Sequence, residues 1–270
     1  MEAAFTGAGG AQMHYLRAGR GSPLLLIHGL VGSSAIWRRN IPVLAEHRTV
    51  YALDLLGGTD WVPGLAAGLE ETARRVLATM DALELEQADL VAASHGGAVA
   101  MMLAAVAPHR VKSMVLFAPA NPYSRATDWM VRAYGSGLGG AVAGIAPRLP
   151  RWVHRAALAR MFGDKRRIPE GCLEPYREAL RAPGAMPQVM SIVRCWFAEM
   201  EKLRSVLPRL TTTPVLLIWG DRDRVVSLES GRRLQRELGA ELAVMPGGGH
   251  LVFEEFADEV NRLMVEWLKR

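Results

Sequence analysis

The sequence lacks several features that would place it outside the ordinary globular proteins. Only two of its 270 residues are cysteines, Cys172 and Cys195, which are too few for a disulfide framework and do not have the spacing of a metal site. The chain begins without the basic segment and apolar stretch of a secretory signal. Its charge-free stretches are either interrupted by Pro and Gly or shorter than the roughly 20 residues that a membrane helix needs. We therefore expect a cytoplasmic protein with no metal and no membrane partner.

The charges are ordinary in number and uneven in distribution. The formal net charge is +5, and residues 121–210 hold 15 Lys or Arg against 7 Asp or Glu. A nucleic-acid surface would combine such charge with stacking aromatics or a known motif, and the only basic cluster of note is Lys165-Arg166-Arg167. We interpret the excess as a solvated helical surface and expect no nucleic-acid partner, although an anionic partner stays open, as does the oligomeric state.

Short apolar runs alternate with helical patterns over most of the chain. This alternation predicts an α/β fold with a mostly parallel, doubly wound sheet that is covered on both faces. The expected strands lie at 24–27, 49–53, 89–93, 112–117, 214–220 and 241–245, and the expected helices at 70–83, 96–107, 228–238 and 254–268.

Residues 120–210 break this rhythm. They contain prolines, a glycine-rich patch at 135–144 and no convincing β-branched run, so amphipathic helices are the best interpretation. We predict a core domain formed by residues 1–119 and 211–270, with residues 120–210 inserted as a helical cap.

Ser94 is the first candidate for chemistry. It stands between an expected strand and an expected helix, with the small residues Ala92 two positions before it and Gly96 two positions after it. A strand that turns sharply into a helix needs small neighbours, and it lifts the residue at the turn above the edge of the sheet. Taken alone, the pattern also suits a serine that merely caps the helix.

Partners for that serine follow two later strands. Asp223 comes after the strand at 214–220, and His250 follows the strand at 241–245 after three glycines. Parallel strands bring their carboxyl ends to one edge, so a nucleophile, an acid and a base are expected to meet there. Asp221, two residues before Asp223, competes for the acid role.

An oxyanion formed at Ser94 would need two main-chain N–H donors. We expect one from His95, directly after the serine, and the other from Leu30, in the loop that leaves the strand at 24–27. Gly29 and Gly32 allow that loop to curl over the site.

Together these motifs resemble the α/β-hydrolase superfamily, in its cap-bearing, esterase-like branch. His28-Gly29 resembles the oxyanion loop, Ala92-x-Ser94-x-Gly96-Gly97 the nucleophile elbow, Gly220-x-x-Asp223-x-x-Val226 the acid loop, and Gly249-His250 the base. The resemblance implies a serine hydrolase that cleaves a carboxylic ester or related small acyl substrate through an acyl-enzyme, with no cofactor. The turn at 54–60 departs from the pattern of the family, so the resemblance supports the fold more strongly than the substrate.

We expect the substrate pocket to involve six residues: His28, Gly29, Asn121, Trp129, Trp196 and Leu251. Aromatic residues along helices more often pack than bind, but at least one tryptophan of the cap is expected to touch the substrate.

Two other activities stay open. The same three side chains serve C–C bond hydrolases and cofactor-free perhydrolases, although C–C hydrolases commonly carry tryptophan where Leu251 follows His250. A further hypothesis, of a different class, is a ligand receptor that has this fold and little turnover.

Overall fold

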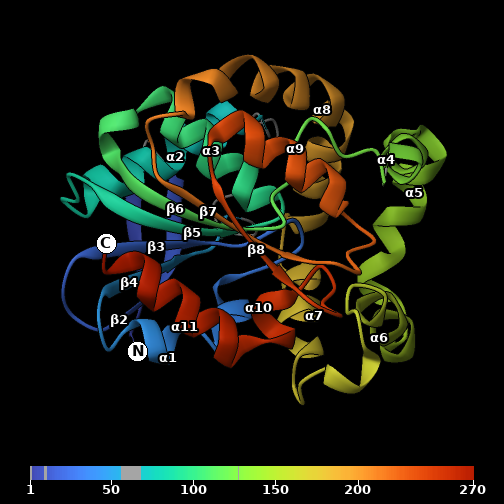
Figure 1. Ribbon diagram of the computed structural model, residues 1–270. Helices are drawn as coiled ribbons and strands as arrows, with labels where there is room; N and C mark the ends of the chain where they lie inside the picture. Colours follow the sequence, from blue (N-terminus) through green and yellow to red (C-terminus); the bar gives the residue numbers. More distant parts are fainter. Residues whose placement is uncertain (1, 9–10, 56–67, 127) are drawn as a thin grey trace.

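The computed structural model describes residues 2–8, 11–55, 68–126 and 128–270 (Figure 1). Within these ranges the chain forms one eight-stranded sheet in the order β1-β2-β4-β3-β5-β6-β7-β8. Strands β3 to β8 pair in parallel, whereas β1 and β2 extend one edge through antiparallel pairings. The strands are β1 (Glu2–Ala8), β2 (Ala11–Ala18), β3 (Pro23–Ile27), β4 (Thr49–Leu53), β5 (Ala88–Ala93), β6 (Val111–Phe117), β7 (Val215–Gly220) and β8 (Glu241–Met245).

The central strands are buried on both faces. In β3, Leu24 and Leu26 belong to one hydrophobic cluster, and Leu25 and Ile27 belong to the other. Successive side chains of a strand point to opposite faces, so a continuous apolar run fits a sheet that is covered on both sides. The predicted α/β fold with a mostly parallel sheet is therefore confirmed.

Helices form a layer on each face of the sheet (Figure 1). One layer contains α2 (Leu69–Ala82), α3 (His95–Val106) and α9 (Leu228–Leu238), and the other contains α1 (Ile41–Leu44), α10 (Val252–Glu255) and α11 (Ala257–Leu268). Every residue of α3 except Val106 is buried. A helix that is apolar all round belongs in the interior, and this one carries Ser94 at its N-terminal end.

The chain between β6 and β7 contains helices and no strand in its described residues. The helices are α4 (Asp128–Gly135), α5 (Gly137–Ile145), α6 (Arg151–Ala159), α7 (Leu173–Arg181) and α8 (Ala185–Val206), joined by turns and loops. Helices α4 and α5 project at the right of Figure 1, and α8 crosses over the top of the core. We refer to residues 120–210 as the helical insertion. In the described part of the chain, no helix is both long enough and apolar enough to cross a bilayer.

Several elements differ from the sequence prediction, and two of them have a clear physical reason. The closing helix begins at Val252 and divides at Phe256, where the backbone leaves helical conformation (φ −126°, ψ 42°). Strand β1 was not predicted, because Glu2–Ala8 contains three alanines and a glycine, which are residues with little strand preference.

Candidate active site

Ser94 lies at a strained turn between β5 and α3. Its backbone has φ 51° and ψ −120°, a conformation that residues with a Cβ seldom adopt. The surrounding main chain holds it there, since Ser94 N–H donates to Phe117 O (2.9 Å) and Ala120 N–H donates to Ser94 O (2.9 Å). This is the geometry that lifts a side chain above the sheet edge.

Small residues around Ser94 are required by close main-chain packing. A Cβ placed on Gly96 would lie 2.3 Å from His28 O and 2.6 Å from Ile27 O, so no larger residue fits without moving β3. Ala92 is fully buried in the core, and the sheet accommodates its methyl group where glycine is more common in the pattern.

Asp223 and His250 meet directly. Nδ1 of His250 lies 2.8 Å from Oδ2 of Asp223, and both side chains are essentially inaccessible to solvent. The other carboxylate oxygen of Asp223 accepts N–H groups from Val225 (2.7 Å) and Val226 (3.0 Å), which fix its orientation. Asp221 instead accepts the N–H of Gly247 (2.7 Å).

The two predicted oxyanion donors face the same space. Leu30 and His95 both line the cavity described below. Among the described residues, neither main-chain N–H donates a hydrogen bond to another residue. Gly29 allows the loop after β3 to pass close to Ser94, because a Cβ on residue 29 would lie only 3.1 Å from the Cβ of Ser94.

The side chain of His28 joins the loop after β3 to the loop after β4 by hydrogen bonds. Its Nδ1 lies 2.7 Å from Gly29 O, and its Nε2 accepts the N–H of Leu55 (2.9 Å). Burial lowers the pKa of His28, so the ring is neutral and Nδ1 is the donor. The rest of the turn at 54–60, from residue 56 on, lies outside the described residues.

A cavity of about 440 Å³ opens above Ser94. Ser94 and His250 both contribute to its wall, and the helical insertion supplies most of the rest. The lining is mostly apolar and includes Val31, Met130, Val131, Met161, Leu173, Leu180, Met186, Val189, Met190, Val193, Val225 and Val226. Such a space suits a small ligand with an apolar body.

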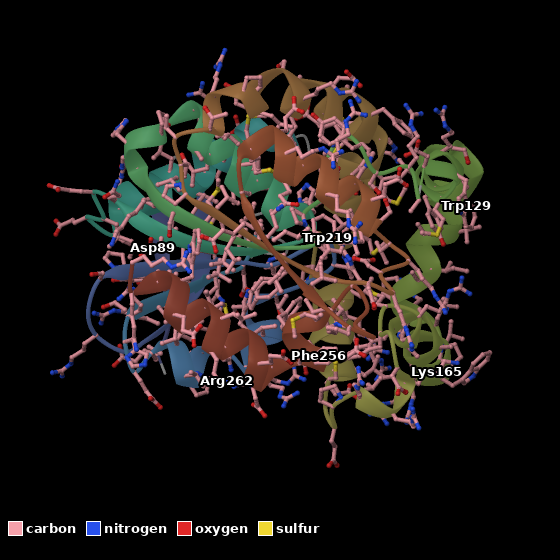
Figure 2. All side chains as sticks on the ribbon, viewed as in Figure 1. Asp89, Trp129, Lys165, Trp219, Phe256 and Arg262 are labelled. Atoms are coloured by element: carbon pink, nitrogen blue, oxygen red, sulfur yellow. The ribbon has the colours of Figure 1, made fainter. Side chains whose placement is uncertain are left out.

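Of the six expected pocket residues, only Trp196 lines this cavity. His28 and Gly29 belong to the loop that follows β3 and do not line the cavity. Asn121 is buried and donates to Pro119 O (3.0 Å) and Ser230 Oγ (3.2 Å), and Leu251 packs in the core. Trp129 is 68% exposed and points away from the body of the protein (Figure 2).

The cavity wall also contains two polar residues that the sequence analysis did not assign to the site. His154 and Arg177 both line it, and Arg177 Nε donates to Nδ1 of His154 (3.2 Å). Helical periodicity could have grouped four residues on one face of α7, namely Leu173, Tyr176, Arg177 and Leu180. It could not have shown that this face points into the cavity.

His95 places a neutral ring in the cavity. Burial, with a further contribution from His28, lowers the pKa of His95 to about 4. Its ring lies 6.3 Å from that of Trp196, with an interplanar angle of 30°. Across the described ranges, no group of three or more His, Cys, Asp or Glu side chains is placed to hold a metal ion.

The sheet, with a serine at its strand-to-helix turn, defines the α/β-hydrolase class. The chain belongs to this family, since the family model described as "alpha/beta hydrolase fold" matches residues 22–257.

Several known proteins are similar over nearly the whole chain. The dihydrolipoyllysine-residue acetyltransferase component of the acetoin cleaving system of Pseudomonas putida is 31% identical over 93% of the chain, which spans 64% of that relative's length. A 2-hydroxy-6-oxo-2,4-heptadienoate hydrolase of Pseudomonas putida is 29% identical, with 97% of this chain and 94% of the relative covered. The solved structure of a meta-cleavage product hydrolase from Pseudomonas fluorescens, a mutant complexed with acetates, has a TM-score of 0.82 at 27% identity and covers 98% of this chain and 97% of that one.

Proposed function

We propose that the protein is a serine hydrolase that cleaves small carboxylic esters with an apolar acyl group. The observation that carries the proposal is the shared cavity wall. Ser94, at its strained turn, and His250, with Nδ1 bound to Asp223, face one apolar space of about 440 Å³. In this proposal the helical insertion is the cap that shapes the acyl site.

The proposed reaction has two steps. His250 Nε2 takes the proton of Ser94, whose Oγ attacks the ester carbonyl, while the N–H groups of Leu30 and His95 stabilise the oxyanion. The proton passes to the departing alcohol and leaves an acyl-enzyme. Water, activated by His250, then releases the acid, and Asp223 holds the ring and stabilises its charged form.

The hydroxyl of Ser94 and the ring of His250 share no hydrogen bond within the described residues. In enzymes without substrate such bonds are often long and shorten only in the bound complex. The proposal therefore requires Ser94 Oγ and His250 Nε2 to come within hydrogen-bonding distance of each other when the substrate binds.

Labelling with a fluorophosphonate and a series of p-nitrophenyl esters of increasing chain length test this function. We expect rapid labelling of the wild-type protein and none of Ser94→Ala, with ester turnover reduced by several powers of ten in the variant. Absence of labelling in the folded wild-type protein would instead favour a ligand receptor. Equal ester turnover in both proteins would refute the role of Ser94.

A second candidate is hydrolysis of a carbon–carbon bond in a dienoate. The similarity to the heptadienoate hydrolase over nearly the full length of both chains favours it. Loss of absorbance of a 2-hydroxy-6-oxo-dienoate substrate, measured beside the esters, separates the two activities. Faster turnover of the dienoate, abolished in Ser94→Ala, would assign the C–C reaction to the same residues.

A further inference from the structure

We propose that Glu255 is a positioning residue that joins the base loop, residues 246–250, to the helical insertion and thereby sets the orientation of the His250 ring. The proposal rests on the proposed function for its catalytic consequence, and the structural part stands independently.

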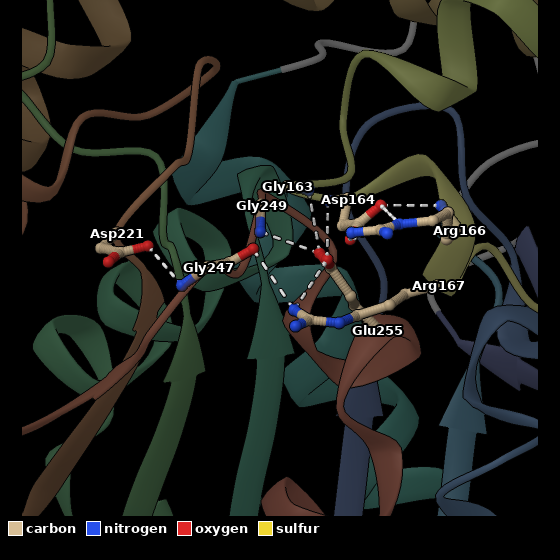
Figure 3. Close-up of polar contacts among 8 residues, drawn as sticks. All are labelled: Gly163, Asp164, Arg166, Arg167, Asp221, Gly247, Gly249 and Glu255. Carbon is tan, nitrogen blue, oxygen red and sulfur yellow. Dashed lines mark hydrogen bonds and ion pairs between the residues drawn. The ribbon is translucent and has the colours of Figure 1, made fainter.

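The carboxylate of Glu255 bridges two segments that are far apart in the chain (Figure 3). Its Oε2 accepts the N–H of Gly249 (2.9 Å) in the base loop and the N–H of Gly163 (3.0 Å) in the insertion. Its Oε1 accepts the N–H of Asp164 (3.0 Å). One side chain therefore satisfies three main-chain donors, and two of them belong to the insertion.

These hydrogen bonds are buried. The side chain of Glu255 has no exposed surface, and Nη1 of Arg167 lies 3.6 Å from its Oε1. A buried carboxylate is tolerated only when donors and charge compensate for the lost water, as the three amides and the guanidinium do here. No other group in the described contacts links these amides, so a residue that accepts fewer hydrogen bonds would leave buried donors unpaired.

The two segments also touch through their main chains. A Cβ on Gly249 would lie 2.4 Å from Gly163 N, and one on Gly163 would lie 2.1 Å from Gly247 O. Directly beside this contact, His250 N–H donates to Met161 O (2.7 Å). The backbone of the catalytic base is thus held by the insertion, and Glu255 closes the same contact from the side of α10.

The His250 ring has a separate anchor in the core, its Nδ1 bond to Asp223. Both anchors together determine where Nε2 points. If the insertion shifts relative to the base loop, the backbone of His250 moves while Asp223 stays, and the ring turns away from its productive direction. A displacement of about 1 Å in such a group can reduce turnover about 100-fold.

Asp221 provides a matched control on the same loop. Its carboxylate also accepts a main-chain N–H, that of Gly247 (2.7 Å), but it does so from an exposed position and, in the described hydrogen bonds, accepts none from the insertion (Figure 3). Glu255→Gln and Asp221→Asn are both changes from a carboxylate to an amide, and only the first removes an acceptor shared with the insertion.

Amide hydrogen exchange measured by mass spectrometry tests the structural part without any substrate. In Glu255→Gln we expect exchange to become at least about tenfold faster in the peptides that cover residues 161–167 and residues 247–252. In Asp221→Asn we expect faster exchange only in the peptide that contains Gly247. Peptides from β5 should exchange as in the wild-type protein in both variants.

The kinetic part uses a p-nitrophenyl ester. We expect kcat to fall about 100-fold in Glu255→Gln with KM within about threefold of the wild type, and both constants to stay near wild type in Asp221→Asn. Should Glu255→Gln fail to fold, Glu255→Asp carries the same comparison, since it keeps the charge and is too short to reach both segments.

Unchanged exchange at residues 161–167 in a folded Glu255 variant would overturn the proposal, as would an equal loss of kcat in the two amide variants. A wild-type protein inactive toward every ester would instead contradict the proposed function, while the exchange comparison would still decide whether Glu255 joins the two segments.

Discussion

At Ser94 the proposed activity and the stability of the fold make opposite demands on the backbone. With φ 51° and ψ −120°, the residue occupies a region that glycine enters freely and that residues with a Cβ enter only under strain. Such strain costs about 1–3 kcal/mol, whereas glycine adds roughly 0.5–1 kcal/mol of backbone entropy to be lost on folding. Ser94→Gly should therefore raise the free energy of unfolding by about 1 kcal/mol.

Ser94→Ala is the matched control, because it removes the hydroxyl and keeps the Cβ that causes the strain. For a chain of this size, 1 kcal/mol corresponds to a change in Tm of roughly 2–4 °C. We expect both variants to lose ester turnover and only the glycine variant to melt later, as followed by circular dichroism. The bonds of Ser94 to Phe117 and Ala120 involve only main-chain atoms, so they persist in both variants. A glycine variant that melts no later than the alanine variant would show that the turn stores no strain.

Three further changes test other parts of the structure. Asp223→Asn should keep the fold and lower kcat by about 10⁴-fold, measured on an ester, because an amide cannot stabilise the charged form of His250; near-normal kcat would remove Asp223 from the mechanism. Burial lowers the pKa of His95 from 6.5 to about 4, so the folded state binds fewer protons than the unfolded state between these values. The free energy of unfolding should accordingly fall by about 3 kcal/mol as the pH drops from 6.5 to 4. Urea unfolding should show a smaller fall for His95→Gln, and an identical pH dependence in both proteins would contradict the lowered pKa of His95. Burial also raises the pKa of Cys172 to about 12, while Cys195 is exposed, so one thiol should react with Ellman's reagent in the native protein and two in guanidinium; two reactive thiols in the native state would contradict the buried position.

Local patterns in the sequence were enough to predict the core of the fold. The strand at Thr49–Leu53 and the helix at Leu228–Leu238 have the limits that the periodicity indicated. Periodicity and capping act over a few residues, so they can be read without knowledge of the partners. Strand β1 was not predicted because its residues have little intrinsic preference for strand. It forms by pairing with the edge of β2.

The arrangement of the site was predictable only in part. Chain order alone put Ser94, Asp223 and His250 each beyond the end of a parallel strand, which follows from topology. Resemblance to the acid loop of the family favoured Asp223 over Asp221, but no local pattern shows where either carboxylate points, because both follow the same strand two residues apart. The turn of the loop directs one carboxylate to His250 and the other to Gly247.

The amino-acid sequence by itself determined the sheet, its helical layers and the order of the polar residues along its edge, since these depend on neighbours in the chain. Tertiary structure decided what surrounds those residues. It turned Trp129 toward solvent, brought Arg177 to the cavity wall and placed Glu255 against Gly163, some 90 residues away, because the packing of one helix face against another depends on partners that no local pattern specifies.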